Sequence, residues 1–400
     1  MLGRGFFALV VVGFVAAVLP TAAPAATTCT LAGKRGYGSG NAGPTDYRYY
    51  VRPRGAIDVA VIFADFTDAP GDGIPTQEVY DSAIPGADAY LRTASHNRMS
   101  LRVSARHGWV RMPWRSSAYG FHKKSPPANT DWWYLADAIT AANPDLDFSN
   151  TDVVIVFTPP RARFTAGWAT IFGPRVGFAR ADGRTLGFGI TFGNDMYDEN
   201  GAPYEPEATP SVVHELLHTF GLPDLYRIGG NELDIGVWDP MSEHRARFGL
   251  TAWHLRKLGW LPARNVTCLE RRRSRRPRRI TATLRPLGTG IGRQALILPL
   301  TRARAWVIES RQKVGLDREI CRPGVLVYSV DAARAGDGDA PIRALPASTR
   351  TSERCGELAN ATYSVGPGRR STAHDPRSGL TVKVLRDSIS GSRVRVTLRR

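Results

Sequence analysis

The stretch SVVHELLHTFGLPDLY, from Ser211 to Tyr226, decides how the rest of the sequence is interpreted. His214 and His218 are four residues apart, so on a helix they project from the same face. Two imidazoles at that spacing can both reach one zinc ion at about 2.0–2.1 Å. Apolar residues surround both histidines and would bury the rest of the helix. A helix that carries two histidines by chance is the alternative, and the bare pattern does not separate the two interpretations.

The residues after the two histidines provide a way for the chain to turn back. Gly221 can adopt a positive φ and end the helix, and Pro223 cannot continue it. Asp224 lies ten residues after the first histidine, and a carboxylate is a good zinc ligand. We therefore predict Asp224 as the third ligand, with His244 and His254 as its rivals further along the chain.

Three other side chains are candidates for the same cleft. Glu215 follows the first histidine directly, where it can accept a proton from water and pass it to a leaving amine. Tyr226 could hydrogen-bond a ligand or stabilise an oxyanion, and packing is its alternative role. His244 lies three residues past Met241, close enough to line the cleft.

The stretch HELLHTFGLPD resembles the extended zinc motif of the metzincin-like peptidases that use Asp where others use a third His. These include the snapalysin-like enzymes and the immune inhibitor A-like family of secreted metallopeptidases. The resemblance to the second family is wider and spans roughly residues 55 to 331. The segments that carry it, in chain order, are VIFADF, YLRTASHNRMSLRVSARHGWVRMP, HELLHTFGLPDLY, WDPMS, LTAWHLRKLGWL, WVIESRQKVGLD and GVLVYSVD.

Carried over residue by residue, the resemblance implies His214, His218 and Asp224 as zinc ligands and Glu215 as the general base. It implies Met241 as a methionine turn beneath the metal, for which ordinary core packing is the alternative. The expected activity is that of a secreted zinc endopeptidase acting on protein or peptide substrates. The rival is a secreted surface- or polyanion-binding protein whose zinc site is structural or vestigial.

The first residues have the composition of a secretory signal peptide. A positive residue precedes the apolar run FFALVVVGFVAAVLP, and small residues follow it, so we predict a signal peptide over residues 1–26 and an extracellular location. The four cysteines then suggest two disulfides. Three pairings are open, and our first choice joins Cys321 to Cys355 and Cys29 to Cys268.

The hydrophobic pattern predicts an α+β chain of two domains. Buried strands and helical segments alternate up to the zinc motif, and short alternating strands separated by Gly, Pro and Asp follow it. We expect a metzincin-like catalytic domain over residues 27–262, with a twisted mixed sheet and the zinc helix. A basic linker over residues 263–279 and a smaller, sandwich-like β domain over residues 280–400 would follow.

The net charge of +17 and the pI of about 10.2 favour acidic partners. The densest run is RRRSRRPRR, from Arg271 to Arg279, which is either a solvated linker or a site for an anionic cell-surface polymer. We expect no nucleic acid partner, no membrane span and a monomer.

Acidic residues before the zinc motif suggest a calcium site. Asp195, Asp198 and Glu199 lie close together in the sequence, and Ca²⁺ prefers oxygen ligands. The spacing matches no defined calcium loop, so solvated turns are the alternative.

Overall fold

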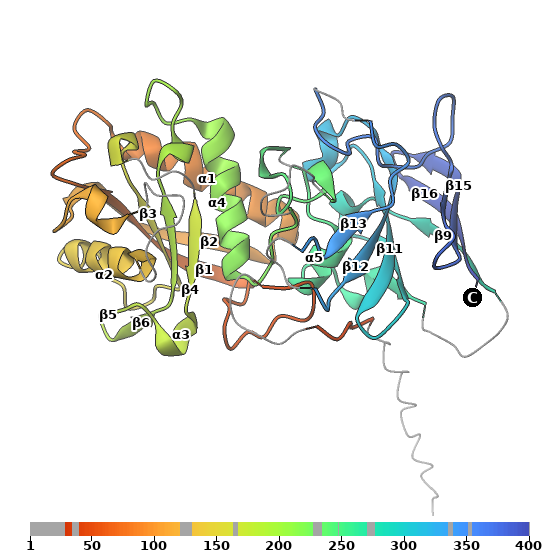
Figure 1. Cartoon of the computed structure of the whole chain (residues 1–400), viewed down its shortest axis with the longest axis horizontal. Coiled ribbons are helices and arrows are strands. Elements are labelled where there is room, and N and C mark those ends of the chain that lie inside the picture. Colours follow the sequence, from red (N-terminus) through yellow and green to blue (C-terminus); the bar gives the residue numbers. More distant parts are fainter. Residues whose placement is uncertain are drawn as a thin grey trace, which may run out of the picture.

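The computed structural model describes residues 29–33, 40–120, 130–162, 167–226, 234–246, 248–269, 277–334, 339–350 and 354–399. The expected signal peptide lies outside these ranges, as does most of the arginine-rich run. The fold is a mixture of α and β with several sheets and few helices, which is compatible with the expected α+β class (Figure 1). In the described part of the chain, no helix is both long and apolar enough to cross a bilayer.

The N-terminal part is built on a mixed five-stranded sheet with the strand order β2-β1-β3-β7-β4. The edge strand β4 runs antiparallel to β7, and the other pairs are parallel. The five strands are β1 (Gly55–Asp65), β2 (Met99–Arg111), β3 (Val153–Phe157), β4 (Trp168–Ile171) and β7 (Phe188–Phe192).

The stretch MSLRVSARHGWVRMP, from Met99 to Pro113, alternates in a way that predicts a pair of strands, and this prediction is wrong. The segment forms the single strand β2, which lies parallel to β1 along its whole length. A bulge around Gly108, at φ 94°, takes up a shift of register between Arg106 and Val110. Because glycine tolerates this conformation, the turn signal bends a strand here and does not reverse it.

Helices cover both faces of this sheet. The helices α1 (Thr76–Ser95) and α4 (Glu205–Thr219) pack on the face to which Val61 and Phe63 point. On the other face α2 (Thr130–Ala142) packs against Ala60 and Ile62. A strand buried on both sides reads as a continuous apolar run, which is the pattern of VAVIFA in β1. The remaining small elements of this part are α3 (Gly173–Val176) and the hairpin of β5 (Ala179–Ala181) and β6 (Arg184–Leu186).

Two sheets make up the C-terminal part, and one apolar cluster fills the space between them. The first sheet has the order β13-β12-β11-β10-β8, and the second has the order β14-β15-β16-β9. The first contains β8 (Val266–Cys268), β10 (Ala295–Pro299), β11 (Arg304–Arg311), β12 (Gly324–Asp331) and β13 (Ile342–Ala344). The second contains β9 (Arg278–Leu284), β14 (Thr372–Asp375), β15 (Leu380–Ser388) and β16 (Gly391–Leu398).

Part of the segment expected to be a linker belongs to this sheet structure. Strand β8 pairs in parallel with β10, so residues 266–268 are not linker. All three side chains are partly buried, so their sequence does not alternate between buried apolar and exposed polar residues as a strand usually does. Arg278 and Arg279, at the end of the basic run, begin β9.

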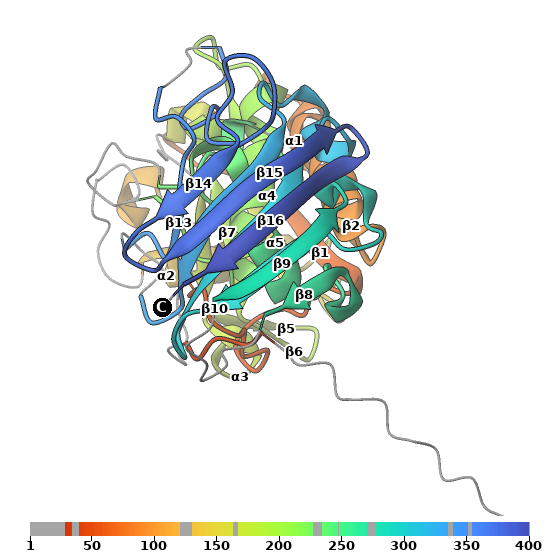
Figure 2. The same ribbon diagram turned by 90° about the vertical axis from the view of Figure 1, so that its right-hand side faces the viewer.

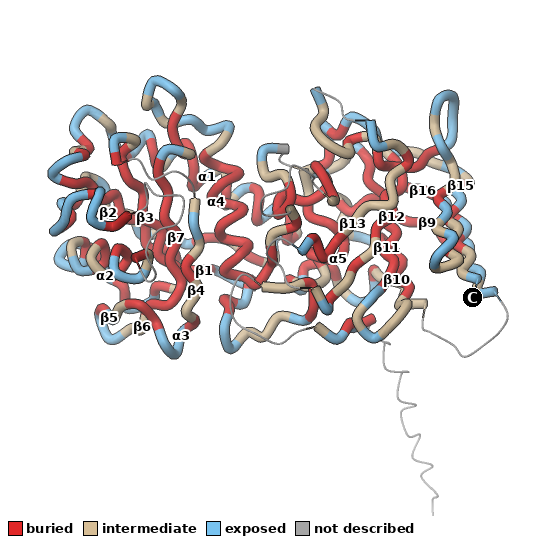
Figure 3. Tube along the Cα trace, viewed as in Figure 1, coloured by how far each residue is buried: buried red, intermediate tan, exposed pale blue. Residues whose placement is uncertain are grey.

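The two parts meet across a continuous core, and buried backbone runs from one to the other (Figure 3). The largest apolar cluster contains residues of α4 together with residues of β10, β11 and β12. The short helix α5 (Ala252–Lys257) lies between the two parts, where the backbone N–H of Trp253 donates to the hydroxyl of Tyr328.

The N-terminal segment of the described chain is tied to both parts. Disulfides join Cys29 to Cys268 and Cys321 to Cys355, the pairing that the sequence analysis favoured. The indole of Trp253 donates to the carbonyl of Ala42, which holds this segment against α5.

Candidate metal centre

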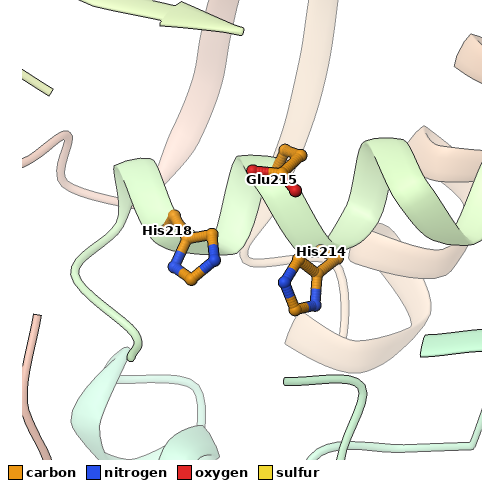
Figure 4. Close-up of side chains that lie close together, drawn as sticks. All are labelled: His214, Glu215 and His218. Atoms are coloured by element: carbon orange, nitrogen blue, oxygen red, sulfur yellow. The ribbon is translucent and has the colours of Figure 1, made fainter. Parts of the chain in front are cut away.

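Helix α4 presents the two histidines on one side (Figure 4). Every residue from Ala208 to Thr219 is buried, so the helix is held by packing along its whole C-terminal half. His214 and His218 are themselves buried, with ring centroids 4.8 Å apart. Such burial excludes water from most of the surface of each ring and leaves few partners for its nitrogens.

The helix ends at the expected glycine. Gly221 has φ 90°, which confirms the predicted positive φ, and its N–H donates to the carbonyl of His218. The N–H of Leu222 reaches back to the carbonyl of Leu217 at 3.1 Å, the six-residue closure typical of a helix end at glycine. This turn returns the chain toward the histidines and brings Asp224 to them.

The hydrogen bonds of the histidines determine which ring nitrogen carries the proton. Nδ1 of His214 lies 3.0 Å from the carbonyl oxygen of Pro240, and Nδ1 of His218 lies 2.9 Å from that of Leu222. A carbonyl oxygen can only accept, so each neutral ring is protonated at Nδ1 and leaves Nε2 with a lone pair.

Both of these Nε2 atoms face the same carboxylate oxygen. Oδ1 of Asp224 is 3.1 Å from Nε2 of His214 and 3.4 Å from Nε2 of His218. It is buried, and with both rings neutral it has no proton to accept. Two lone pairs and a negative oxygen therefore converge on a space that requires a positive charge, which is the donor set of a metal site.

The pKa shifts in the pocket also indicate that positive charge is favoured between these side chains. Burial acts to lower the pKa of His218, but its hydrogen bond with Asp224 and the charge of that residue outweigh burial and raise the pKa to about 9. Burial acts to raise the pKa of Asp224, but hydrogen bonds donated by His214 and His218 with Nε2 protonated outweigh burial and lower it. Without a metal, protons on the rings would therefore supply the positive charge.

Glu215 is also part of this group. Its carboxylate and the nitrogens of His214 and His218 lie within 4.8 Å of one another, so these three residues could hold a metal ion. Oδ1 of Asp224 also faces both ring nitrogens, so Glu215 and Asp224 are both placed where a third ligand could lie.

Strand β4 begins next to Glu215. A Cβ atom at Gly167 would lie 3.1 Å from Cγ and 3.2 Å from Oε1 of Glu215, so the strand approaches this closely only because residue 167 has no side chain. No local signal in the sequence marks Gly167 as part of the site.

Asp195, expected as a calcium ligand, also lies near Glu215. Its Oδ1 accepts the N–H of Gly193 at 3.0 Å, and burial, with a smaller contribution from the charge of Glu215, raises its pKa to about 6. Asp198 instead accepts the N–H groups of Asn200 and Ala202, and Glu199 is exposed.

Within the described residues, Asp195, Asp198 and Glu199 do not come together as a carboxylate group. The expected calcium cluster is therefore not formed by these side chains. The physical reason is that the carboxylates of Asp195 and Asp198 are used locally to close turns of the backbone.

The turn that contains Met241 lies beneath the histidines. Met241 is fully buried, and its carbonyl accepts the N–H of Leu225 at 2.8 Å, next to Asp224. The preceding carbonyl, of Pro240, contacts Nδ1 of His214. The turn therefore orients one histidine and anchors the chain that carries the aspartate.

Asp239 supports this turn from below, and the sequence analysis missed it. Its carboxylate accepts the N–H of Met241 at 3.1 Å and both the N–H and the hydroxyl of Thr251 at 2.9 Å. Nδ1 of His254 lies 3.0 Å from the same carboxylate. His254, the alternative third ligand, therefore contacts Asp239 and not the other two histidines. Burial acts to raise the pKa of Asp239, but the charge of His254 and these hydrogen bonds lower it.

A buried ionic network continues from this turn into the β-rich part. Arg311 on β11 donates to the carbonyl of Trp238 at 3.0 Å and to both carboxylate oxygens of Asp317 at 2.6 Å. Glu309 accepts from Arg311 and from Tyr328. The second part of the chain therefore helps to fix the turn below the candidate metal centre.

Tyr226 and His244 both flank His214. The ring of Tyr226 stacks on that of His214 with centroids 6.5 Å apart, and the ring of His244 is 5.5 Å away. Burial lowers the pKa of His244 to about 4, so the ring is neutral at pH 7. His244 also lines a cavity of about 550 Å³ next to the centre, whose other walls include Val213 and Phe248.

The comparison with known proteins gives no relative that could assign a function. No protein-family description matches the chain, and no curated protein matches it. The function is therefore argued from the geometry of the site.

Proposed function

We propose that the chain is a secreted zinc endopeptidase whose metal is held by His214, His218 and Asp224. The observation that carries the proposal is the convergence of both Nε2 atoms and Oδ1 of Asp224 on one buried space. Ligands at about 2.0–2.1 Å from a tetrahedral zinc ion are about 3.3 Å apart. The contacts of Asp224 with the two rings, at 3.1 and 3.4 Å, agree with that spacing.

The number of protein ligands supports a catalytic site. Structural zinc sites are closed by four protein ligands, whereas catalytic sites keep one position open. With Asp224 as the third ligand, Glu215 stays uncoordinated, and a purely structural site has no need of it. The rival interpretation, a binding protein with a structural or vestigial metal, leaves this buried carboxylate unexplained.

Glu215 is suited to move protons in the reaction. When bound, zinc would polarise the substrate carbonyl and lower the pKa of a bound water. The carboxylate of Glu215 accepts the proton of the attacking water and delivers it to the leaving nitrogen.

The edge strand β4 supports a peptide substrate. It pairs with β7 on one side only, and Gly167, which directly precedes it, lies beside Glu215. Trp168 at its start is 55% exposed. An extended peptide that pairs with such an edge lies in a fixed position along the strand, close to the metal.

More detailed predictions follow from the same proposal. The mixed sheet and α4 would form the upper part of a metzincin-like catalytic domain, with Met241 as its methionine turn and the β-rich part as a second domain. Tyr226 or His244 would contact the developing oxyanion or line the cleft. Two disulfides and the absence of a membrane-spanning helix among the described residues are compatible with a secreted protein.

The experiment compares the wild-type chain with Glu215→Gln, Asp224→Asn and, as a control, Glu199→Gln, which removes an exposed carboxylate. Zinc content and casein cleavage are measured for each. We expect Glu215→Gln to keep its zinc and lose about 10²–10⁴-fold in rate. We expect Asp224→Asn to lose zinc, and the control to match the wild type.

Two results would contradict the proposal. Wild-type chain that holds one zinc ion and cleaves no protein or peptide is not a peptidase. Zinc bound by Asp224→Asn with wild-type affinity would remove Asp224 from the ligand set and leave Glu215 as the alternative third ligand.

A further inference from the structure

One face of the four-stranded sheet is open to solvent and carries concentrated positive charge. This sheet lies at the end of the molecule away from α4, and its outer face points toward the viewer in Figure 2. Apolar side chains point inward into the core, and basic side chains alternate with them and are exposed. We call the following five exposed residues the basic face: Arg279 on β9, Lys383 and Arg386 on β15, and Arg393 and Arg395 on β16.

The strand register places like charges directly opposite each other. Lys383 pairs with Arg395, and Arg386 pairs with Arg393, across the β15–β16 ladder. Like charges in such cross-strand positions destabilise a sheet. The arrangement is therefore unfavourable for folding, and an external anion would relieve it.

No internal anion provides that relief in the part of the chain that the structure describes. None of the five side chains has an ion pair or a hydrogen bond there. The strands β9, β15 and β16 contain one acidic residue, Asp387, which is engaged by Gln312, Ser364 and Ser392. The charge of the basic face is thus available to a ligand.

The spacing of these charges suits a chain of anions. Neighbouring strands are about 4.8 Å apart, and every second residue along a strand is about 7 Å further on. Arginine binds phosphate and sulfate oxygens through two parallel N–H groups, and four of the five residues are arginine. A linear polymer laid over the strands could therefore contact several cations at once.

A groove at the end of the same sheet extends the positive surface. It has a volume of about 1070 Å³, and six arginines and two aspartates line it. Arg278 is the first residue of β9, Arg399 directly follows β16, and Arg377 is also part of the lining. In the described chain the side chains of Arg377 and Arg399 have no partner.

We propose that the basic face binds a linear polymer with repeated phosphate or sulfate groups. Single-stranded nucleic acid is disfavoured, because β9, β15 and β16 offer no aromatic side chain on which a base could stack. An anionic membrane is the alternative that the test must separate, since Ile389 at the β15–β16 turn is exposed. The site is far from α4, so this binding does not depend on the proposed peptidase activity.

The test measures binding of the full chain to dextran sulfate and to long-chain polyphosphate, with neutral dextran and vesicles containing anionic phospholipid as further arms. Every chain carries Glu215→Gln, so that self-cleavage cannot change the result. The face variant contains Arg279→Gln, Lys383→Gln, Arg386→Gln, Arg393→Gln and Arg395→Gln. The control variant loses the same charge from exposed residues elsewhere: Arg54→Gln, Arg115→Gln, Arg161→Gln, Arg175→Gln and Arg180→Gln.

We expect both polyanions to bind in a salt-dependent manner. In the face variant, the plot of log affinity against log salt concentration should be less steep by about 3–5. Its affinity near 0.1 M salt should be at least about 30-fold lower than that of the parent chain. The control variant should lose less than about 3-fold. Thermal unfolding should show the face variant folded and at least as stable as the parent, because two like-charge pairs are removed.

Three outcomes would overturn the proposal. Equal losses in the two variants would mean that net charge alone drives binding. Unchanged polyanion binding by a folded face variant would place the site elsewhere. Binding to the vesicles and to neither polyanion would assign the face to a membrane. None of these outcomes bears on zinc content or peptide cleavage, so the two proposals can fail separately.

Discussion

Gly221 gives the sharpest test of how the metal site is assembled. It has φ 90° at the end of α4, and a Cβ atom there would lie 2.8 Å from Cγ2 of Thr45 and 3.2 Å from Cγ of Tyr50. Gly221→Ala therefore combines backbone strain of about 1–2 kcal/mol with a steric overlap that costs about 1–3 kcal/mol. The expected loss of unfolding free energy is about 2–5 kcal/mol.

A second glycine separates the two contributions. Gly73 has φ 79° and nothing within 4 Å of the position of its Cβ, so Gly73→Ala should cost only the backbone strain of about 1–2 kcal/mol. Adding Thr45→Ser to Gly221→Ala removes the nearest methyl group and should restore about 1 kcal/mol. Urea unfolding followed by tryptophan fluorescence measures all of these variants, with and without zinc.

The same substitution should weaken zinc binding. The turn at Gly221 carries Leu222, whose carbonyl orients His218, and it leads to Asp224. Gly221→Ala should therefore lower zinc affinity, while Gly73→Ala should not. If the two alanine variants lose the same stability and Thr45→Ser restores nothing, then contact with the N-terminal segment does not determine the geometry of this turn.

Two further predictions concern buried charges away from the metal ligands. Arg311→Met leaves Asp317 and Glu309 without their buried cation, so the free energy of unfolding measured with urea should fall by about 3–5 kcal/mol. Arg304 is exposed on the same strand, and Arg304→Met should change this free energy by less than about 0.5 kcal/mol. Equal effects would refute the role of the network. Burial lowers the pKa of Lys257 to about 7, so the unfolded chain binds a proton between about pH 7 and pH 10.5 that the folded chain does not. The free energy of unfolding, relative to that of Lys257→Met, should therefore rise with pH over that window, by at most about 5 kcal/mol. Urea unfolding at pH 6.5 and pH 9.5 measures this difference. If it shows no rise, the pKa of Lys257 is not lowered in the folded chain.

Local features of the sequence anticipated much of the candidate centre. The spacing of His214 and His218 is a property of one helix, and the positive φ of Gly221 is a property of one residue. The buried strand β1 was also visible, because its apolar run is continuous. In each case interactions within a few residues are sufficient for the prediction.

Contacts between distant segments could not be read in this way. The sequence suggested calcium for Asp195, but packing of η3 (Asn194–Met196) against α4 brings it near Glu215. Asp239 precedes Met241 in the sequence, and only the fold shows that it also binds Thr251 and His254. The sequence predicts a pair of strands where the structure has the single long strand β2, because a glycine bulge and a glycine turn look alike in sequence.

The sequence by itself determined the helix that carries the two histidines, the glycine that ends it and the composition that makes the chain basic. These depend on spacing, on backbone freedom and on counting charges, which are local properties. Tertiary structure alone decided that Oδ1 of Asp224 faces both Nε2 atoms, and that Arg279 shares a sheet face with Arg393 and Arg395. Strand register and core packing determine such positions, because each depends on contacts between segments far apart in the chain.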